Sequence, residues 1–267
     1  MLEALEGEEA GVEIGGIRIN NLRYADDIVV IAETVEDLQR MVGRIEEQCR
    51  RYRLIINRNK TKSLKIGREI TNMNIRLNTG EIEQVNGFKY LGVHLGEDGR
   101  TERAVGERIA MGQRAFGRMR KIWRSNTVSI RLKLRLLSSV VIPTTLYGAE
   151  CWVLGKREER KLLAFEMKCL RRICGIRWED RVSNDEVRAR TGQLVTIMDR
   201  VKDMQRRWFG HVVRMSGERW PNVAFHGRVE GTRPRGRPRD TWIKKFRMAN
   251  ENRSVRELID LAADRQG

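Results

Sequence analysis

Two adjacent aspartates, Asp26 and Asp27, are the residues of this chain best suited to do chemistry. They interrupt an apolar run over residues 22–31 that is short and rich in β-branched side chains, which favours a strand. Charges inside such a run are costly to bury unless something neutralises them, and a divalent cation would do so. Mg²⁺ is usually held by one or two carboxylates together with substrate phosphates. The alternative is a solvated Asp-Asp turn in an ordinary hairpin.

Three motifs follow one another in a fixed order along the first hundred residues. They are Tyr24-Ala25-Asp26-Asp27, Asn57-x-x-Lys60-Thr61-Lys62 and Phe88-Lys89-Tyr90-Leu91-Gly92. In this order they resemble the second half of the palm of a reverse transcriptase, with the closest resemblance to the polymerases of non-LTR (LINE-type) retrotransposons. Four later segments look like the region after the polymerase domain of the same elements: residues 146–152, 170–175, 207–212 and 235–238. The resemblance therefore covers nearly the whole chain.

The resemblance implies roles for individual side chains of the first two motifs. At the tip of a β-hairpin, Asp26 would bind catalytic metal directly and Asp27 would be a weaker or indirect ligand. The intact enzyme would use two Mg²⁺ or Mn²⁺ ions for nucleotidyl transfer. Tyr24 would lie near the primer terminus or the nucleotide. Lys60 or Lys62 could protonate or neutralise the departing pyrophosphate, and two solvated loop lysines are the alternative.

The third motif combines aromatic faces, a cation and a glycine that allows close backbone approach, which suits contact with a nucleic-acid strand. The resemblance implies a hairpin that grips the primer, with Phe88, Lys89, Tyr90 and Gly92 as the contacting residues. Read from its pattern alone, the segment 88–95 is one strand that ends at the turn cluster 96–99. An ordinary edge strand is the alternative.

Charge is distributed unevenly along the 267 residues, whose formal net charge is +17. Residues 1–100 hold 15 Lys and Arg against 17 Asp and Glu, whereas residues 101–267 hold 38 against 19. This asymmetry favours a polyanionic partner such as nucleic acid, and a basic but inert surface is the alternative. By resemblance, Arg114, Arg118 and Lys121 lie in a thumb-like region that tracks the template–primer duplex. A solvated helix face is the alternative for these three.

The run 234–239 matches the core of an AT-hook, in which Arg235 and Arg237 would lie in a narrow A·T minor groove. A basic linker is the alternative and the one that we favour. In the family, similar Gly-Arg-Pro runs precede a Trp-containing helix, which here would carry Trp242.

The four cysteines show no disulfide spacing, so we expect no disulfide-linked partner and a reducing compartment. Cys169 and Cys174 could join His211 and His226 in a zinc site, but the spacing matches no common zinc pattern and buried thiols are favoured. The acidic first residues are not a signal peptide. No run of about 18 apolar residues is present, so no membrane partner is expected. These features predict a nuclear or cytoplasmic protein.

Periodicity divides the chain into a strand-rich first part and a helical remainder. We expect an α+β fold in which a partial palm (residues 1–100, β-hairpins plus one helix) precedes a thumb-like helical region (101–182) and a basic helical C-terminal region (183–267). Expected helices are 34–53, 105–123, 130–141 (stopped by Pro143), 158–174 (ended by Gly175), 194–215 and 255–263. Thr34 can cap the first of these, whose apolar face, with Tyr52 at its end, is expected to pack beneath the YADD hairpin. Expected strands are 54–56 and 63–66, with a hairpin over 75–85. The stretches 183–192 and 216–239 are predicted linkers.

Family polymerases carry a further metal-binding aspartate and fingers before the YADD motif, which begins at residue 24 here. We therefore expect the C-terminal part of an RNA-directed DNA polymerase that acts on an RNA template and a DNA primer or target. We expect it to be inactive as an isolated chain, and whether this chain is itself an enzyme stays open. One alternative is a non-catalytic, basic nucleic-acid-binding remnant, and another is an interaction protein built on the helices.

Overall fold

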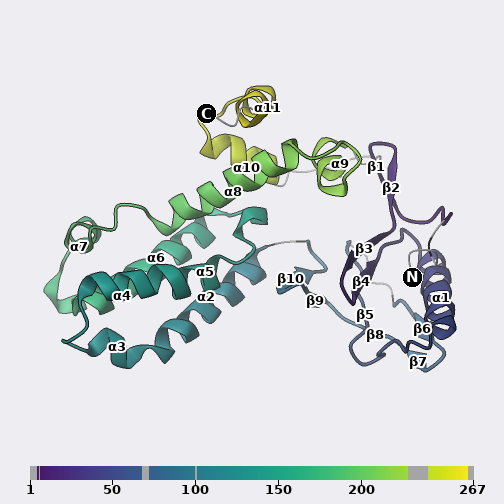
Figure 1. The fold of residues 1–267 in the computed structure, drawn as a ribbon, viewed down its shortest axis with the longest axis horizontal. Helices are drawn as coiled ribbons and strands as arrows, with labels where there is room; N and C mark the ends of the chain where they lie inside the picture. The colour runs from purple at the N-terminus through teal and green to yellow at the C-terminus, as the bar shows by residue number, and fades with distance from the viewer. Residues whose placement is uncertain (1–4, 6, 68–71, 100, 228–239, 264–267) are drawn as a thin grey trace. The chain divides into compact units, whose positions relative to one another are not determined.

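The computed structural model describes residues 5, 7–67, 72–99, 101–227 and 240–263 (Figure 1). They fall into two compact units. The hairpin unit takes its described residues from Met1–Tyr90, Leu95–Gly99 and Val212–Arg237, and the helical unit from Leu91–His94, Arg100–His211 and Pro238–Gly267. The predicted α+β class, with hairpins first and helices after them, is confirmed. The division into three domains stays a prediction.

The described strands of the chain are short and pair two by two. Three pairs are antiparallel hairpins and β5–β8 is parallel. The pairs are β1 (Val12–Ile14) with β2 (Ile17–Ile19), β3 (Asn21–Tyr24) with β4 (Asp27–Val30), β5 (Lys62–Ser63) with β8 (Glu83–Gln84), β6 (Arg76–Leu77) with β7 (Gly80–Glu81), and β9 (Gly87–Tyr90) with β10 (Val93–Gly96).

Helix α1 (Val35–Arg51) supplies most of the apolar surface on which the hairpins rest. Its predicted cap is confirmed, because Thr34 Oγ1 accepts a hydrogen bond of 3.1 Å from the Asp37 amide. Met41, Ile45 and Cys49 form a buried cluster, and Val30 at the end of β4 packs against it. The helix therefore packs against the YADD hairpin, as the periodicity predicted. Tyr52, expected on the same apolar face, is 60% exposed because the helix has already ended.

Three strand predictions made from the sequence pattern are wrong. Residues 54–56 form no strand and Ile55 is 89% exposed, because no described segment pairs with them. The predicted strand 63–66 is reduced to the two residues of β5. The segment 88–95 is not one strand: a turn at Leu91 and Gly92 divides it into β9 and β10, so the hairpin implied by the family resemblance is the better description.

The helical unit is built from consecutive helices with short connections. They are α2 (Glu102–Arg118), α3 (Arg120–Arg124), α4 (Ile130–Leu136), the π-helical turn η2 (Leu137–Val141), α5 (Ile142–Leu146), η3 (Ala149–Cys151), α6 (Lys156–Cys174), η4 (Trp178–Asp180), α7 (Asn184–Thr191), α8 (Ile197–Val213), α10 (Trp242–Ala249) and α11 (Val255–Ala263). None of the helices that the structure describes combines the length and apolar composition that a membrane span requires.

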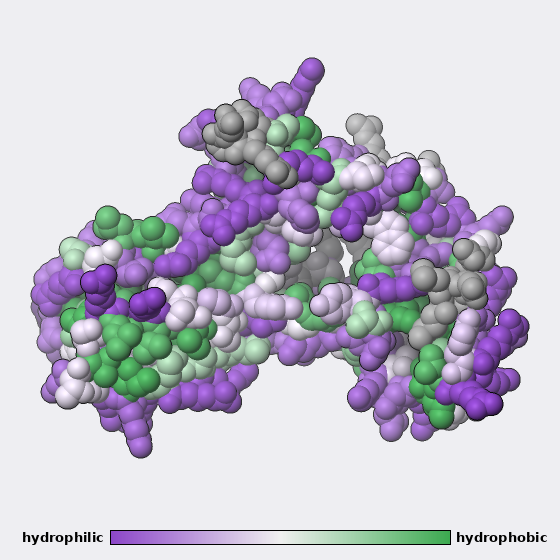
Figure 2. Space-filling model, viewed as in Figure 1, coloured by the Kyte–Doolittle hydropathy of each residue, from purple (hydrophilic) through white to green (hydrophobic). Residues whose placement is uncertain are grey.

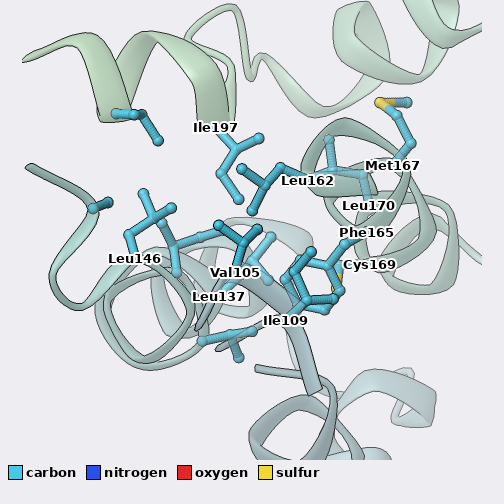
Figure 3. Close-up of a cluster of buried hydrophobic side chains, with 14 of the residues drawn as sticks. Val105, Ile109, Leu137, Leu146, Leu162, Phe165, Met167, Cys169, Leu170 and Ile197 are labelled. Carbon is cyan, nitrogen blue, oxygen red and sulfur yellow. The ribbon is translucent and has the colours of Figure 1, made fainter. Parts of the chain in front are cut away.

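Helices α2, α4, α5, α6 and α8, together with η2, share one apolar core (Figure 3). Its side chains come from sequence positions far apart and face one another in the close-up, among them Val105, Ile109, Leu137, Leu146, Leu162, Phe165, Cys169, Leu170 and Ile197. The predicted end of α6 is confirmed: Gly175 has φ of 69°, and its amide bonds the carbonyls of Arg171 and Arg172.

Pro143 does not stop a helix, so that prediction is wrong. The helical run continues from α4 through η2 into α5, which ends at Leu146. Proline lacks an amide hydrogen and its ring presses on the carbonyl four residues back. Here the Ile142 amide bonds the carbonyl of Leu137, five residues back, and Pro143 occupies the first turn of α5, where proline is tolerated.

The two predicted linkers contain helices, so these predictions are also wrong where the structure describes them. Ser183 Oγ caps α7 by accepting from the Glu186 amide at 3.2 Å, and Val187 is fully buried. In the hairpin unit, α9 (Trp220–His226) is held by Asn222, whose amide donates to the Val212 carbonyl at 3.0 Å. Both helices are too short to show a period of their own, so tertiary contacts stabilise them.

The Trp-containing helix expected after the Gly-Arg-Pro run is present as α10. The Trp242 indole donates to the Glu150 carbonyl at 2.7 Å and stacks on Phe246, with ring centroids 4.9 Å apart. Phe209 of α8 packs against Phe246 at 4.7 Å. An aromatic cluster therefore attaches α10 to α8 and to the segment that precedes α6.

Gly112 of α2 provides a test of how closely the helices approach. A Cβ at this position would collide with Thr145 Oγ1 and lie 3.1 Å from Phe165 Cζ, and Thr145 is fully buried. We predict that Gly112→Ala lowers the free energy of unfolding by about 1–3 kcal/mol through overpacking. Helix propensity alone would raise it by about 1 kcal/mol.

Gly106→Ala in the same helix is the matched control, because nothing lies within 4 Å of its missing Cβ. Here only propensity acts, so the free energy of unfolding rises by about 0.5–1 kcal/mol. Urea denaturation followed by far-UV circular dichroism measures both variants. Shifts of the same sign would contradict the close approach of α2 and α5.

Candidate functional site

The YADD motif forms the tip of the β3–β4 hairpin. Tyr24 pairs with Asp27, so Ala25 and Asp26 are the two residues of the turn. Ala25 has φ of 49°, a left-handed conformation that costs a non-glycine residue about 1–2 kcal/mol. Asp26 and Asp27 are exposed and Tyr24 is 65% exposed. The expectation that both carboxylates lie within a strand is therefore wrong, since Asp26 lies in the turn and neither charge is buried.

The two carboxylates offer the hard oxygen ligands that Mg²⁺ or Mn²⁺ prefers. Within the described part of the chain, no three His, Cys, Asp or Glu side chains gather as a metal-binding group. Asp26 and Asp27 therefore fit one ion whose shell is completed by water and substrate phosphates, and the described residues do not assemble ligands for a two-ion clamp. Such an ion would neutralise charge that develops on the transferred phosphate.

Tyr90 of β9 brings the third motif close to the first. Burial raises the pKa of the Tyr90 phenol, and the negative charge of Asp27 raises that pKa further. Phe88 and Tyr90 are half-buried, whereas Lys89 between them is exposed, as alternation along a strand requires. An aromatic strand and a carboxylate-bearing hairpin tip therefore lie within electrostatic range of each other in the hairpin unit.

The second motif is a turn built on Asn57. The Asn57 side chain accepts a hydrogen bond of 3.2 Å from the Lys60 amide, and its carbonyl accepts from the Thr61 amide at 3.0 Å. The two lysines then differ. Lys62 in β5 forms an ion pair with Glu83, its partner in β8, whereas Lys60 is exposed with no ion pair to another described residue. Lys60 is thus the better placed of the two to meet a phosphate.

The basic residues predicted to face a duplex are exposed. Arg114 and Arg118 lie one turn apart on α2, and Lys121 follows on α3. None of the three forms an ion pair within the part of the chain that the structure describes. The visible face of the helical unit is mostly hydrophilic, and an apolar patch lies over α4 (Figure 2), where Ile130 and Leu132 are exposed. The three cations are available to a polyanion.

Reasoning from the sequence missed two residues, Arg108 and Tyr147, that contact the turn of the third motif. Both donate hydrogen bonds to the turn of the third motif, Arg108 to the Gly92 carbonyl and Tyr147 to that of Leu91. The space beside Gly92 is therefore occupied by protein, and contact of Gly92 with nucleic acid stays a prediction. The sequence does contain one indication that Arg108 is special: it interrupts the apolar face of α2 between Val105 and Ile109.

Cys169 and Cys174, considered above for a zinc site, lie on α6 and are removed from solvent to different degrees. Cys169 is 1% exposed, and burial raises its pKa to about 12. Cys174 is half-buried, and burial raises its pKa as well. His211 is exposed on α8 beside Trp208, with ring centroids 5.9 Å apart. Cys169 belongs to the apolar core of the helical unit, which agrees with the preference for core thiols. Arg235 and Arg237 lie outside the described residues, and their minor-groove role stays a prediction.

Comparison with known proteins supports part of this description. Residues 3–95, which contain all three motifs, match the reverse transcriptase (RNA-dependent DNA polymerase) family. The chain is also similar to an uncharacterized transposon-derived protein of Caenorhabditis elegans, at 26% identity over 219 residues, which is 79% of this chain and 78% of that protein. No solved structure matches the chain. The chain is therefore similar to reverse transcriptases through β10, and the second similarity extends into the helices.

The proximity of Tyr90 and Asp27 can be tested directly. We predict that Asp27→Asn lowers the pKa of Tyr90 because a negative charge near the phenol is removed, while the contribution of burial remains. The measurement is a pH titration of ¹³C-ring-labelled tyrosine by NMR, with Tyr90→Phe to assign the signal. Asp26→Asn is the control and should move this pKa less. An unchanged pKa in Asp27→Asn would show that β9 does not lie near the hairpin tip.

Proposed function

We propose that this chain is the C-terminal part of the reverse transcriptase of a non-LTR retrotransposon. The observation that carries the proposal is the Asp26-Asp27 hairpin tip with Tyr90 of β9 within range of its charge. A metal-binding tip beside a strand with aromatic and basic side chains is what positioning a primer end at the reacting phosphate requires. The similarity of residues 3–95 to reverse transcriptases supports the same assignment.

In this proposal Asp26 is the main metal ligand and Asp27 the weaker one. Tyr24, exposed at the same tip, contacts the primer terminus or the nucleotide. Lys60 meets the departing pyrophosphate, and Lys62 holds β5 to β8 through Glu83. Phe88, Lys89 and Tyr90 contact the primer strand. The substrates are an RNA template and a DNA primer or target, and the metal is Mg²⁺ or Mn²⁺.

We further propose that catalysis needs at least one more carboxylate than the described residues gather. Two exposed carboxylates hold Mg²⁺ weakly, because the ion keeps much of its water and depends on substrate phosphates for its other ligands. A clamp on both the attacking and the leaving oxygen needs ligands from more than one strand. The chain by itself then binds template–primer without extending it. A non-catalytic nucleic-acid-binding protein is the second candidate, favoured by this shortage of ligands.

Primer extension tests the proposal. We predict no synthesis by the full chain alone with Mg²⁺ or Mn²⁺, and synthesis when a reverse-transcriptase segment with the other palm aspartate and fingers is added in trans. Asp26→Asn should abolish the complemented activity by removing the main ligand. Asp185→Asn, an exposed carboxylate on α7, should leave it unchanged. Synthesis by the chain alone that is lost in Asp26→Asn would refute the need for a further ligand, and no synthesis after complementation would favour the non-catalytic candidate.

The basic helices generate a separate prediction on binding. For a duplex, log affinity should fall linearly with log salt, with a slope of about −0.9 per phosphate contact. Replacing Arg114, Arg118 and Lys121 with Gln should reduce the magnitude of that slope by up to about 2.7, because each loses one phosphate contact. Fluorescence anisotropy over a salt series measures it.

A variant with the same loss of charge provides the control. Arg51, Arg190 and Arg207 are exposed, and each already forms an ion pair one helical turn away, with Glu47, Glu186 and Asp203. Their replacement with Gln should change the slope little. An equal change in both triple variants would mean that net charge, and not the α2–α3 surface, determines binding.

A further inference from the structure

The turn between β9 and β10 adopts a conformation that its sequence does not favour. Leu91 has φ of 46° and Gly92 has φ of 80°, so both central residues are left-handed, as a two-residue hairpin turn of this type requires. Glycine accepts this conformation readily, but leucine does not, because its Cβ crowds the following carbonyl. A strained conformation persists only where the surroundings hold it.

Two side chains of the helical unit hold this turn by its carbonyl groups. The Tyr147 hydroxyl donates to the Leu91 carbonyl at 3.0 Å, and the Arg108 guanidinium donates to the Gly92 carbonyl. The guanidinium carbon lies 4.3 Å from the centre of the Tyr147 ring, a cation–π contact that fixes the two anchors to each other. We name Arg108 and Tyr147 the turn anchor.

Glycines make room for the anchor on both sides. A Cβ on Gly92 would lie 3.1 Å from Arg108 Nη2 and 3.3 Å from Tyr147 Cε1. Gly148, with φ of 77°, follows Tyr147, and a Cβ there would lie 3.1 Å from Val93 Cγ2. The Tyr147-Gly148 pair therefore packs against the Leu91-Gly92 pair. The segment 146–152, which the family resemblance identified without assigning it a role, thus has a structural role.

A third link attaches the same hairpin to α2. His94 Nδ1 lies 3.5 Å from Glu107 Oε1, and Glu107 precedes Arg108 in the helix. The His94 side chain is only 9% exposed. Two consecutive residues of α2 therefore lie against the hairpin: Arg108 at the Gly92 carbonyl and Glu107 near the His94 imidazole.

We propose that Arg108 and Tyr147 are positioning residues that hold the Leu91-Gly92 turn and thereby the point at which the primer-contacting segment Phe88-Lys89-Tyr90 ends; the inference rests on the proposed function. Tyr90 is bonded directly to Leu91, so the anchor holds the residue that follows the primer-contacting segment. Arg108 is 8% exposed, and the Gly92 carbonyl and the Tyr147 ring already engage its guanidinium. In contrast to Arg114 and Arg118 on the same helix, it does not bind phosphate.

The test uses the full chain with Tyr147→Phe, which removes one hydroxyl, and Arg108→Lys, which keeps the charge but loses the planar fork. Tyr52→Phe and Arg114→Lys, both at exposed positions, are the matched controls. Hydrogen exchange of the peptide over residues 88–95 reports the turn. We expect exchange there to accelerate by about tenfold in each anchor variant, the equivalent of about one hydrogen bond, and not in the controls.

A primer that carries photoreactive nucleotides at its 3′ end and in the strand just behind it, annealed to an RNA template, reports the positioning role. The wild-type chain should crosslink to residues 88–90. Tyr147→Phe should lose most of this crosslink, while its duplex affinity and thermal midpoint stay within experimental error of wild type. A purely structural tyrosine would lower the midpoint and the affinity together and leave the crosslink site unchanged, which would overturn the proposal.

The remaining outcomes separate the two proposals. Unchanged exchange in both anchor variants would overturn the anchor itself. Accelerated exchange with no wild-type crosslink to residues 88–90 would confirm the anchor, but it would overturn the primer contact of the proposed function and the positioning role with it. Loss of duplex affinity in Arg108→Lys greater than in Arg114→Lys would show that Arg108 binds phosphate, contrary to the proposal.

Discussion

A guanidinium taken out of water must find acceptors, and Arg108 is the place in this protein where that requirement has the widest consequences. Its position on the buried face of α2 leaves it between apolar side chains, so its acceptor has to come from another segment. The Gly92 carbonyl meets this need, and the Tyr147 ring accepts the charge on its face. One buried cation therefore joins α2, the segment after α5 and the β9–β10 turn. The glycines at 92 and 148 follow from the space that this junction needs.

The hairpin unit depends on a different constraint, which is that two-stranded sheets are marginal by themselves. Its hairpins gain stability from α1 through the clusters around Met41 and Ile75. Packing on one side leaves the opposite ends of the hairpins open to solvent, so Asp26 and Tyr24 are exposed at a tip held from below. In the proposed function, this exposure is what admits a primer end and a metal ion carried with substrate phosphates.

Charge and packing divide the helices between two tasks. The interior faces form one apolar core in which even Cys169 stays protonated, while the exposed faces carry the excess of positive charge. Buried Arg108 and Lys133 serve the fold: Lys133 Nζ donates to the carbonyls of Trp123 and Ser125, at 3.1 and 2.8 Å, where α3 ends. Basic residues of this region are thus of two kinds, and burial distinguishes those that bind carbonyl groups from those available to a polyanion.

The sequence by itself determined the long elements, because an apolar period over several turns outweighs local detail: α1 with its Thr34 cap and α6 with its Gly175 end. Its motifs also determined which residues to consider as a site. Where an apolar period is too short to be recognised, or where the interacting segment is distant in sequence, only the tertiary structure decided the local conformation. It converted residues 88–95 into a hairpin, formed α7 inside a predicted linker, and carried a helix past Pro143 through a π turn. It also brought Arg108 and Tyr147 to the turn at Leu91 and Gly92, because a hydrogen bond across 56 residues, from Tyr147 to Leu91, leaves no mark on any local pattern.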